Sequence, residues 1–245
     1  MHLSRVVSRK AVAIGDFLRA ARHAEIFGNY LYRYVQVCHD GSMPPLSLNS
    51  SALVICECQA GFIDPAFAYL GGLAEQAETR QIVPKIAELA AAVREAGRPV
   101  IHSTIVHRRS WAGVSNAARI VRVAKRSAVA MEGDPSSAIV PELSPADSDI
   151  LSQRSSGNTI FYNTDLDSIL RVAEVDTIIL VGVSTNLALY SASVEATNRN
   201  YTVVLAEDCC AGATVETHAF MIEHLLPLVS TVTTSDAVVK SLRAL

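Results

Sequence analysis

The chain has 245 residues, of which 50% are hydrophobic and 18% are charged. This composition excludes a disordered, collagen-like or coiled-coil protein and is typical of one large globular domain. Lys and Arg total 21 against 24 Asp and Glu, a net charge of -3, so the chain lacks the overall basic field that favours nucleic acid.

The first 48 residues differ in composition from the rest. Six basic residues stand there against three acidic ones, and no apolar core of signal-peptide length precedes a small-residue cleavage site. We therefore expect 1–48 to be an N-terminal extension and 49–245 to be the main domain. The extension is either a helical appendage or the product of a reading frame that begins ahead of Met43.

From residue 51 onward, short apolar runs alternate with amphipathic stretches. This alternation predicts βαβ units, and hence an α/β protein with a doubly wound parallel sheet and helices on both faces. Ligands bind such sheets at the carboxyl ends of the strands, so the candidate site residues are those that follow each strand. The expected strands are 52–58, 99–104, 149–152, 177–181, 202–206 and 230–233, and the expected helices are 79–96, 115–126, 165–173, 186–198, 215–226 and 235–243.

Several of these helices carry terminal signals. Thr79 and Thr214 can cap helix starts, and Ser235 can open the last helix. Gly97 can end the first long helix, because glycine tolerates the left-handed conformation that follows many helices.

The polar and cysteine patterns predict neither a membrane span nor a metal site. The longest uncharged run lies between Asp176 and Glu195, and its Ser, Thr and Asn residues make it too polar for a membrane span. The five cysteines form no CxxC motif and no Cys/His pair at metal spacing. This cysteine usage is that of a cytoplasmic protein.

The first expected strand contains one acid, Glu57. Alternation places it on the face opposite Cys56 and Cys58, in an otherwise apolar strand. Burial there would raise its pKa toward neutral and suit it to general acid/base catalysis. The alternative is a structural Glu57 that accepts hydrogen bonds from the backbone or from an Arg and braces the sheet.

The fourth expected strand runs into a small, polar turn, Gly182-Val183-Ser184-Thr185-Asn186, before a helix that begins near Leu187. Free backbone N–H groups at the start of a helix form a cradle for a carbonyl oxygen or an anion. The alternative is an ordinary turn capped by Ser184 or Thr185.

Five segments form a recognisable set, in order and spacing: LVICECQ at 53–59, AGRPVI at 96–101, TDLD at 164–167, GVSTN at 182–186 and YTVVLAED at 201–208. Together they resemble the isochorismatase-like, or cysteine hydrolase, superfamily over about residues 50–236. The resemblance implies a six-stranded, mainly parallel sheet of order 3-2-1-4-5-6, assembly into dimers or tetramers, and a non-proline cis peptide beside the Gly-Val turn. It also implies a site of Asp, Lys and Cys that cleaves small amides, ureido compounds or a vinyl ether.

The chain departs from the superfamily's pattern at all three catalytic positions. Glu57 stands at the Asp position, Ser155 at the Lys position with Arg154 one residue away, and Ala188 at the Cys position. Alanine offers no nucleophile, so the usual thioester chemistry cannot run.

Three interpretations follow from this departure. The first is a hydrolase without a covalent step, in which Glu57 moves the proton and the turn at 183–186 binds the developing charge. The second moves the thiol to Cys209 or Cys210, just beyond the fifth strand, with Arg154 or His218 as its basic neighbour. The third is an inactive fold that serves as a binding or scaffold protein.

Further candidates line the expected pocket. His107 follows the second strand and could contact an anionic substrate together with Arg108 or Arg109, the alternative being a solvated loop histidine. Trp111 and Asn116 are weaker pocket candidates, and His218 and His224 are expected at the surface or at an interface. The expected catalytic residues are Glu57, Arg154 and Ser155, and the expected substrate-binding residues are Gln59, Phe62, His107, Val183, Ser184, Thr185, Asn186 and Ala188.

The expected partners follow from the same observations. The run Ser103–His107 has no Asp-x-His pair of the kind through which the superfamily's nicotinamidases bind a metal, so we expect neither a metal nor a cofactor. We expect a small-molecule substrate, no nucleic acid and no membrane, and the resemblance implies a homo-oligomer.

Overall fold

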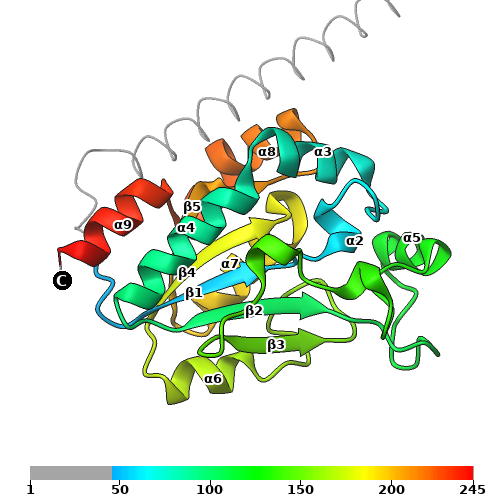
Figure 1. Ribbon diagram of the computed structural model, residues 1–245, viewed down its shortest axis with the longest axis horizontal. Helices are drawn as coiled ribbons and strands as arrows, with labels where there is room; N and C mark the ends of the chain where they lie inside the picture. Colours follow the sequence, from blue (N-terminus) through cyan, green and yellow to red (C-terminus); the bar gives the residue numbers. More distant parts are fainter. Residues whose placement is uncertain (1–45, 245) are drawn as a thin grey trace, which may run out of the picture. The chain divides into compact units, whose positions relative to one another are not determined.

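The computed structural model describes residues 46–244 (Figure 1). The extension expected at 1–48 therefore lies, apart from its last three residues, outside the described residues. Leu48 is fully buried in the hydrophobic core, so the main domain begins before residue 49.

The sheet has six parallel strands in the order β3-β2-β1-β4-β5-β6, which confirms the expected α/β architecture. Every residue of the three strands at its centre, β2, β1 and β4, is buried, as in parallel sheets covered on both faces. The strand order reverses between β1 and β4, which is where ligands bind in such sheets. The strands are β1 (Ser51–Cys56), β2 (Val100–Ile105), β3 (Ile150–Arg154), β4 (Thr177–Val183), β5 (Thr202–Ala211) and β6 (Thr231–Thr233).

All six expected strands are present, and the larger differences lie at their carboxyl ends. β1 ends at Cys56. Glu57 was expected to lie within this strand, but it is the residue that follows it. β5 continues to Ala211, after a register shift opposite Leu180 and Gly182. The apolar alternation predicted the strands, but a bulge of this kind leaves no mark on hydrophobic periodicity.

The helices connect the strands on both faces of the sheet. In Figure 1, α4 and α9 lie over one face and α7 behind the other, and α4 and α9 pack against β5. The α-helices are α2 (Ala60–Ile63), α3 (Gly71–Thr79), α4 (Ile82–Glu95), α5 (Arg119–Ser127), α6 (Leu166–Val172), α7 (Tyr190–Asn198), α8 (Val215–Phe220) and α9 (Ser235–Arg243). Single π-helical turns, η3 (Thr185–Leu189) and η4 (Met221–Leu225), precede α7 and follow α8, and short 3-10 turns are η1 (Pro135–Ser137), η2 (Pro141–Leu143) and η5 (Leu226–Leu228).

The capping expectations hold for three residues and fail for one. Thr214 accepts a hydrogen bond from the Thr217 N–H at the start of α8, Gly97 follows α4 with a φ of 69°, and Ser235 opens α9. Thr79 instead ends α3, a helix that the sequence did not predict, and Gln81 precedes α4.

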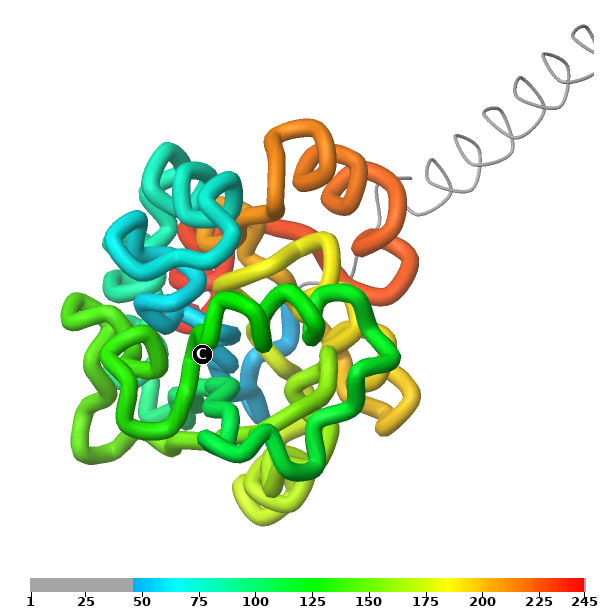
Figure 2. Tube along the Cα trace, turned by 90° about the vertical axis from the view of Figure 1, so that its right-hand side faces the viewer, coloured from blue at the N-terminus to red at the C-terminus, as the bar shows by residue number. Residues whose placement is uncertain are grey.

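The carboxyl ends of the strands lie at one edge of the sheet. In Figure 1 the arrowheads of β1, β2 and β3 point toward α2 and α5, and Figure 2 views that edge directly. This is the edge at which the candidate residues were expected. Among residues 46–244, no helix is long and apolar enough to cross a membrane.

Candidate active site

Glu57 occupies the first position after β1, in the left-handed region with a φ of 52°. Its N–H donates a hydrogen bond to the Ser103 carbonyl at 2.9 Å, so the residue remains tied to β2. Left-handed backbone is unfavourable for a residue with a Cβ, and it is often found where a structure must aim a side chain. The Glu57 side chain is 13% exposed and forms an ion pair with Arg154.

Arg154 is the last residue of β3, and its side chain is buried. Its Nη2 donates to Oε1 of Glu57, whereas Nε and Nη1 have no hydrogen-bond partner among the described residues. The pair therefore joins the ends of β3 and β1 across β2, and the Glu57 carboxylate neutralises the buried guanidinium.

Ser155, the other candidate for the Lys position, is directed elsewhere. Its carbonyl accepts a hydrogen bond from Nδ1 of His107 at 2.9 Å, and its hydroxyl accepts one from Nη1 of Arg108 at 3.0 Å. Of the two candidates, Arg154 is the one that reaches Glu57. A catalytic role for Ser155 stays a prediction.

A small cavity of about 60 Å³ lies beside Glu57, at the carboxyl edge of the sheet. That volume holds a few water molecules or a small polar molecule. Of the expected binding residues, Phe62, His107 and Ala188 line it. The sequence analysis did not predict the other lining residues, which are Tyr69, Ile105, Ile120, Val121, Ala124, Gly157, Asn158 and Leu187.

These lining residues determine what chemistry the cavity can support. None is a Ser, Thr, Cys or Lys, so the described lining offers none of the side chains that form acyl intermediates in most amide hydrolases. Burial raises the pKa of the Tyr69 hydroxyl, with a contribution from the neighbouring Glu57, and keeps Tyr69 neutral. Glu57 remains as the carboxylate of the cavity and His107 as its imidazole.

The turn after β4 differs from the expected cradle. The Val183–Ser184 peptide is cis, as the resemblance implied. Asn186 uses its side-chain oxygen to accept the Ala213 N–H at 2.9 Å, and Thr185 is buried. From this stretch only Leu187 and Ala188 line the cavity, so the expectation that Val183, Ser184, Thr185 and Asn186 face the substrate is wrong for this cavity.

Gln59 was also expected to bind substrate, but its amide is fully buried. Its Nε2 donates to the carbonyls of Ile105 and Ser137, at 3.0 and 2.7 Å, and its Oε1 accepts the Ile105 N–H at 2.8 Å. These bonds tie the start of α2 to the end of β2. Gln59 is therefore a structural residue, and the binding expectation is wrong.

His107 is not a solvated loop residue. It is 3% exposed, and its ring lies 4.5 Å from the Trp111 ring, measured between centroids. Burial lowers the pKa of His107, the Ser155 carbonyl opposes that effect, and the nearby cations Arg154 and Lys125 reinforce it. The solvated alternative is wrong.

Neither the position nor the acidity of Cys209 and Cys210 supports the interpretation that one of them replaces the missing thiol nucleophile. Cys209 and Cys210 lie within β5 rather than beyond it, both are buried, and neither lines the cavity. Burial raises the pKa of Cys209 to about 12. The Cys210 thiol donates to the Ala206 carbonyl at 3.1 Å. Neither group is poised to form a thiolate.

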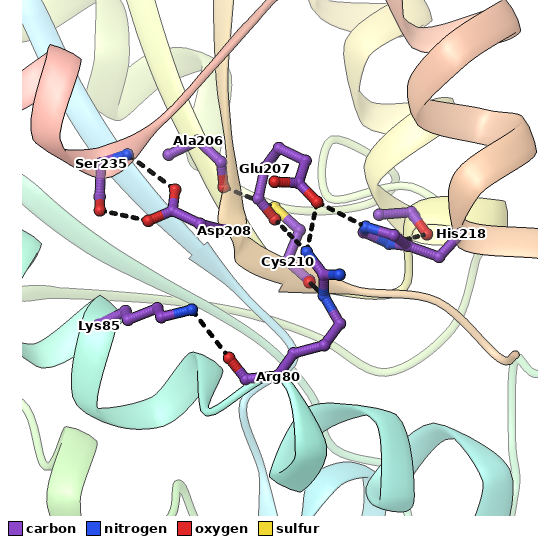
Figure 3. Close-up of polar contacts among 9 residues, drawn as sticks. Arg80, Lys85, Ala206, Glu207, Asp208, Cys210, His218 and Ser235 are labelled. Atoms are coloured by element: carbon purple, nitrogen blue, oxygen red, sulfur yellow. Dashed lines mark hydrogen bonds and ion pairs between the residues drawn. The ribbon is translucent and has the colours of Figure 1, made fainter. Parts of the chain in front are cut away.

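A second polar cluster joins β5 to α8 and to the segment between α3 and α4 (Figure 3). Figure 3 shows Arg80 and His218 both directed at Glu207, with His218 Nε2 3.1 Å from Oε1 of Glu207. The hydrogen bond to His218 lowers the pKa of Glu207 to about 2, burial opposes it, and Arg80 adds to the lowering. His218 is buried, so its expected surface position is wrong.

This cluster has the residue types of a hydrolytic triad but not its accessibility. The Thr185 hydroxyl lies 3.3 Å from Nδ1 of His218, whose Nε2 meets Glu207. However, Thr185 is fully buried, and a Cβ added to Gly212 would come within 2.6 Å of its hydroxyl. Because no substrate reaches a hydroxyl packed in this way, the cluster braces the turn that leads to Ala188.

The described residues do not form an evident metal centre. No group of three or more His, Cys, Asp or Glu side chains converges anywhere in 46–244. The cavity itself offers one carboxylate and one imidazole, fewer than the three protein ligands of a catalytic zinc ion.

Comparison with known proteins identifies the family. Residues 51–237 match the isochorismatase domain. The chain belongs to the isochorismatase family. It is 31% identical over 210 residues to YecD, an uncharacterized isochorismatase family protein of Escherichia coli O157:H7, and that match covers 82% of this chain and 100% of YecD.

Two further relatives of this isochorismatase family member are informative. The ureidoacrylate amidohydrolase RutB of Agrobacterium fabrum is 40% identical over 73 residues, which cover 29% of this chain and 31% of RutB. The crystal structure of an isochorismatase family protein from Desulfovibrio vulgaris superimposes with a TM-score of 0.69 at 25% identity, over 79% of this chain and 98% of that one. The family and fold are thus shown along most of the chain.

Proposed function

We propose that this isochorismatase family member hydrolyses a small polar molecule without forming a covalent intermediate. The observation that carries the proposal is the cavity beside Glu57, whose described lining holds a carboxylate but no Ser, Thr, Cys or Lys. Water is then the nucleophile, and the carboxylate is the group positioned to accept its proton.

Glu57 performs both proton transfers in this mechanism. Oε1 is held by Arg154, which keeps the carboxylate in place at the cavity wall. At an amide or ureido bond, the water oxygen attacks the carbonyl carbon while the carboxylate accepts the water proton. It then returns that proton to the departing nitrogen or oxygen, so the enzyme ends in its starting state.

The bond cleaved is an amide, ureido or vinyl-ether bond. The partial match to a ureidoacrylate amidohydrolase favours the first two. The cavity volume of about 60 Å³ favours a small substrate or a small reacting end of a longer one.

A second candidate function rests on Ala188, which lines the cavity where the family resemblance implies the cysteine nucleophile. This departure favours an inactive relative that has kept the pocket as a binding site. In that case the Glu57–Arg154 pair is retained for stability alone.

One experiment separates the two candidates. The purified full chain is assayed on small amides, ureido acids and isochorismate, beside Glu57→Gln and Ala188→Cys. Turnover that disappears in a folded Glu57→Gln supports the non-covalent hydrolase. If the natural protein turns over none of these compounds and only Ala188→Cys does, the non-covalent hydrolase is overturned and the inactive binding protein is favoured.

A further inference from the structure

His107 is held more rigidly than its place in a loop suggests. Its N–H donates to the Ala130 carbonyl at 2.7 Å, and its own carbonyl accepts the Glu132 N–H at 2.8 Å. The His107 ring packs against the Trp111 ring. The ammonium of Lys125, a residue of α5, lies 5.5 Å from the centre of the Trp111 ring. Backbone and ring are therefore both fixed at the cavity wall.

The hydrogen bond at Nδ1 selects one tautomer of this imidazole. Its partner is the Ser155 carbonyl, 2.9 Å away, and a carbonyl oxygen can only accept. Nδ1 therefore carries the hydrogen, and in the neutral ring Nε2 presents a lone pair.

The surroundings keep the ring neutral. The charged groups around it are Arg154 from β3, Lys125 from α5, Glu57 after β1 and Arg108, which bonds the Ser155 hydroxyl. Burial, Arg154 and Lys125 all disfavour a second proton on the ring. Glu57 is engaged by the Arg154 guanidinium.

Nδ1 of this ring is occupied by the Ser155 carbonyl, which leaves Nε2 as the ring nitrogen available to a molecule in the cavity. It has no hydrogen-bond partner among the described residues, and it is not one of the fully covered atoms that lack a partner. His107 and Glu57 line the same cavity, whose volume is about 60 Å³. A small molecule bound there can therefore contact both side chains.

We propose that His107 is a specificity-determining residue, whose Nε2 accepts a hydrogen bond from an N–H group of the substrate. The inference rests on the proposed hydrolase function and narrows its substrate class. Amides and ureido compounds that retain an N–H can donate a hydrogen bond to Nε2 of His107. A vinyl ether or a fully N-alkylated amide cannot, and leaves Nε2 unpaired. A buried polar group left unpaired in this way is a strong basis for rejecting a substrate analogue.

The first test does not require turnover. In the full chain labelled with ¹⁵N-histidine, the His107 ring nitrogens are assigned by their loss in His107→Gln. Acetamide and N,N-dimethylacetamide are then titrated at pH 7. His102, which is buried beside Asp149, serves as the internal control for non-specific effects.

The expected spectrum shows a neutral ring protonated at Nδ1, and acetamide moves the Nε2 resonance while the dimethyl compound does not. A proton on Nε2 in the free protein overturns the inference. So does an equal response to the two amides, or no response to acetamide at saturating concentration.

The second test uses any amide that the protein hydrolyses. His107→Phe keeps an aromatic ring against Trp111 but removes the acceptor, and it should raise KM at least about tenfold with kcat changed only a few-fold. His107→Gln, whose side-chain oxygen can replace Nε2, should restore most of the binding. An unchanged KM in a folded His107→Phe overturns the inference while leaving the proposed hydrolase standing. Absence of turnover in the natural protein removes the hydrolase, and the spectroscopic test still decides the role of His107.

Discussion

Arg154 and Glu57 lie 97 residues apart in the chain, and they meet as a buried ion pair at the wall of the cavity. The pair links the carboxyl ends of two strands that are not neighbours in the sheet, because β2 lies between β3 and β1. It therefore contributes to stability and to the position of the proposed catalytic carboxylate. These two contributions can be separated by substitution at Arg154.

Arg154→Met should cost about 3 kcal/mol of unfolding free energy, because it leaves a largely buried carboxylate without its cation. Arg154→Lys keeps the charge and should recover much of that loss. Urea unfolding at pH 7, followed by circular dichroism, measures both differences. Equal stability of Arg154→Met and the natural protein would show that the pair does not hold the two strand ends together.

The described cysteines should be inert toward thiol reagents in the folded protein. Cys56, Cys58, Cys209 and Cys210 are buried, and burial raises the pKa of each thiol, that of Cys209 to about 12. At pH 8, a thiol with a pKa of about 12 is ionised to only about one part in ten thousand.

A Cys38→Ser variant removes the one cysteine outside the described residues. It should react with Ellman's reagent only after denaturation, when all four thiols become available. Rapid labelling of one thiol in the folded variant would reopen the hypothesis of a relocated nucleophile.

The sequence predicted the sheet well because parallel strands covered on both faces are continuous apolar runs. The same signal says nothing about where a strand stops, and the position of Glu57 depends on β1 ending at Cys56. Likewise, the pairing of Ile105 with Arg154 at the ends of β2 and β3 decides that Arg154, rather than Ser155, turns toward Glu57. Such strand ends are set by tertiary contacts.

The residues that line the cavity were predicted only in part, again because tertiary contacts decide which side chains meet there. Phe62 and His107 were expected because they follow strands along the chain, and Ala188 because the family resemblance places it at the Cys position. Ile120 and Ala124 come from α5, whose apolar residues gave a helical pattern but no indication of what the helix covers. The buried position of His218 depends on Glu207, which lies on the preceding strand rather than on α8, so periodicity within the helix cannot reveal it.

Gly182→Ala should be among the most damaging single substitutions in the sheet. Gly182 has a φ of 104°, and an added Cβ would lie 2.2 Å from the Cys56 carbonyl oxygen on the neighbouring strand. Backbone must then move at the switch point, which we expect to cost more than about 3 kcal/mol or to prevent folding.

Gly97→Ala is the matched control, because Gly97 also has a positive φ, 69°, but no atom lies within 4 Å of the added Cβ. Only the backbone conformation is penalised there, at about 1–2 kcal/mol. Thermal unfolding of the two variants side by side measures the difference. Similar melting temperatures would mean that the close approach of β1 and β4 at Gly182 is not a constraint.

Glu207 should make the protein less stable in acid. Its pKa is about 2 in the folded protein, below the ordinary value of 4.5, so its pairing stabilises the fold fully above pH 4.5. That stabilisation declines as the pH falls from 4.5 toward 2, because the unfolded chain binds the proton first. The side chain is 29% exposed, and the contribution at pH 7 is on the order of 2–3 kcal/mol.

Glu207→Gln should remove this contribution, so the stability difference from the natural protein is largest at pH 7 and falls to less than about half near pH 3. Glu195→Gln is the control, because Glu195 pairs with Arg199 one helical turn away at a similar exposure. Such an i,i+4 pair contributes only about 0.5 kcal/mol. Urea unfolding of the three proteins at both pH values tests the prediction. A Glu207→Gln difference that stays constant between pH 7 and pH 3 would contradict it, since a group whose pKa is unchanged by folding gives no such dependence on pH.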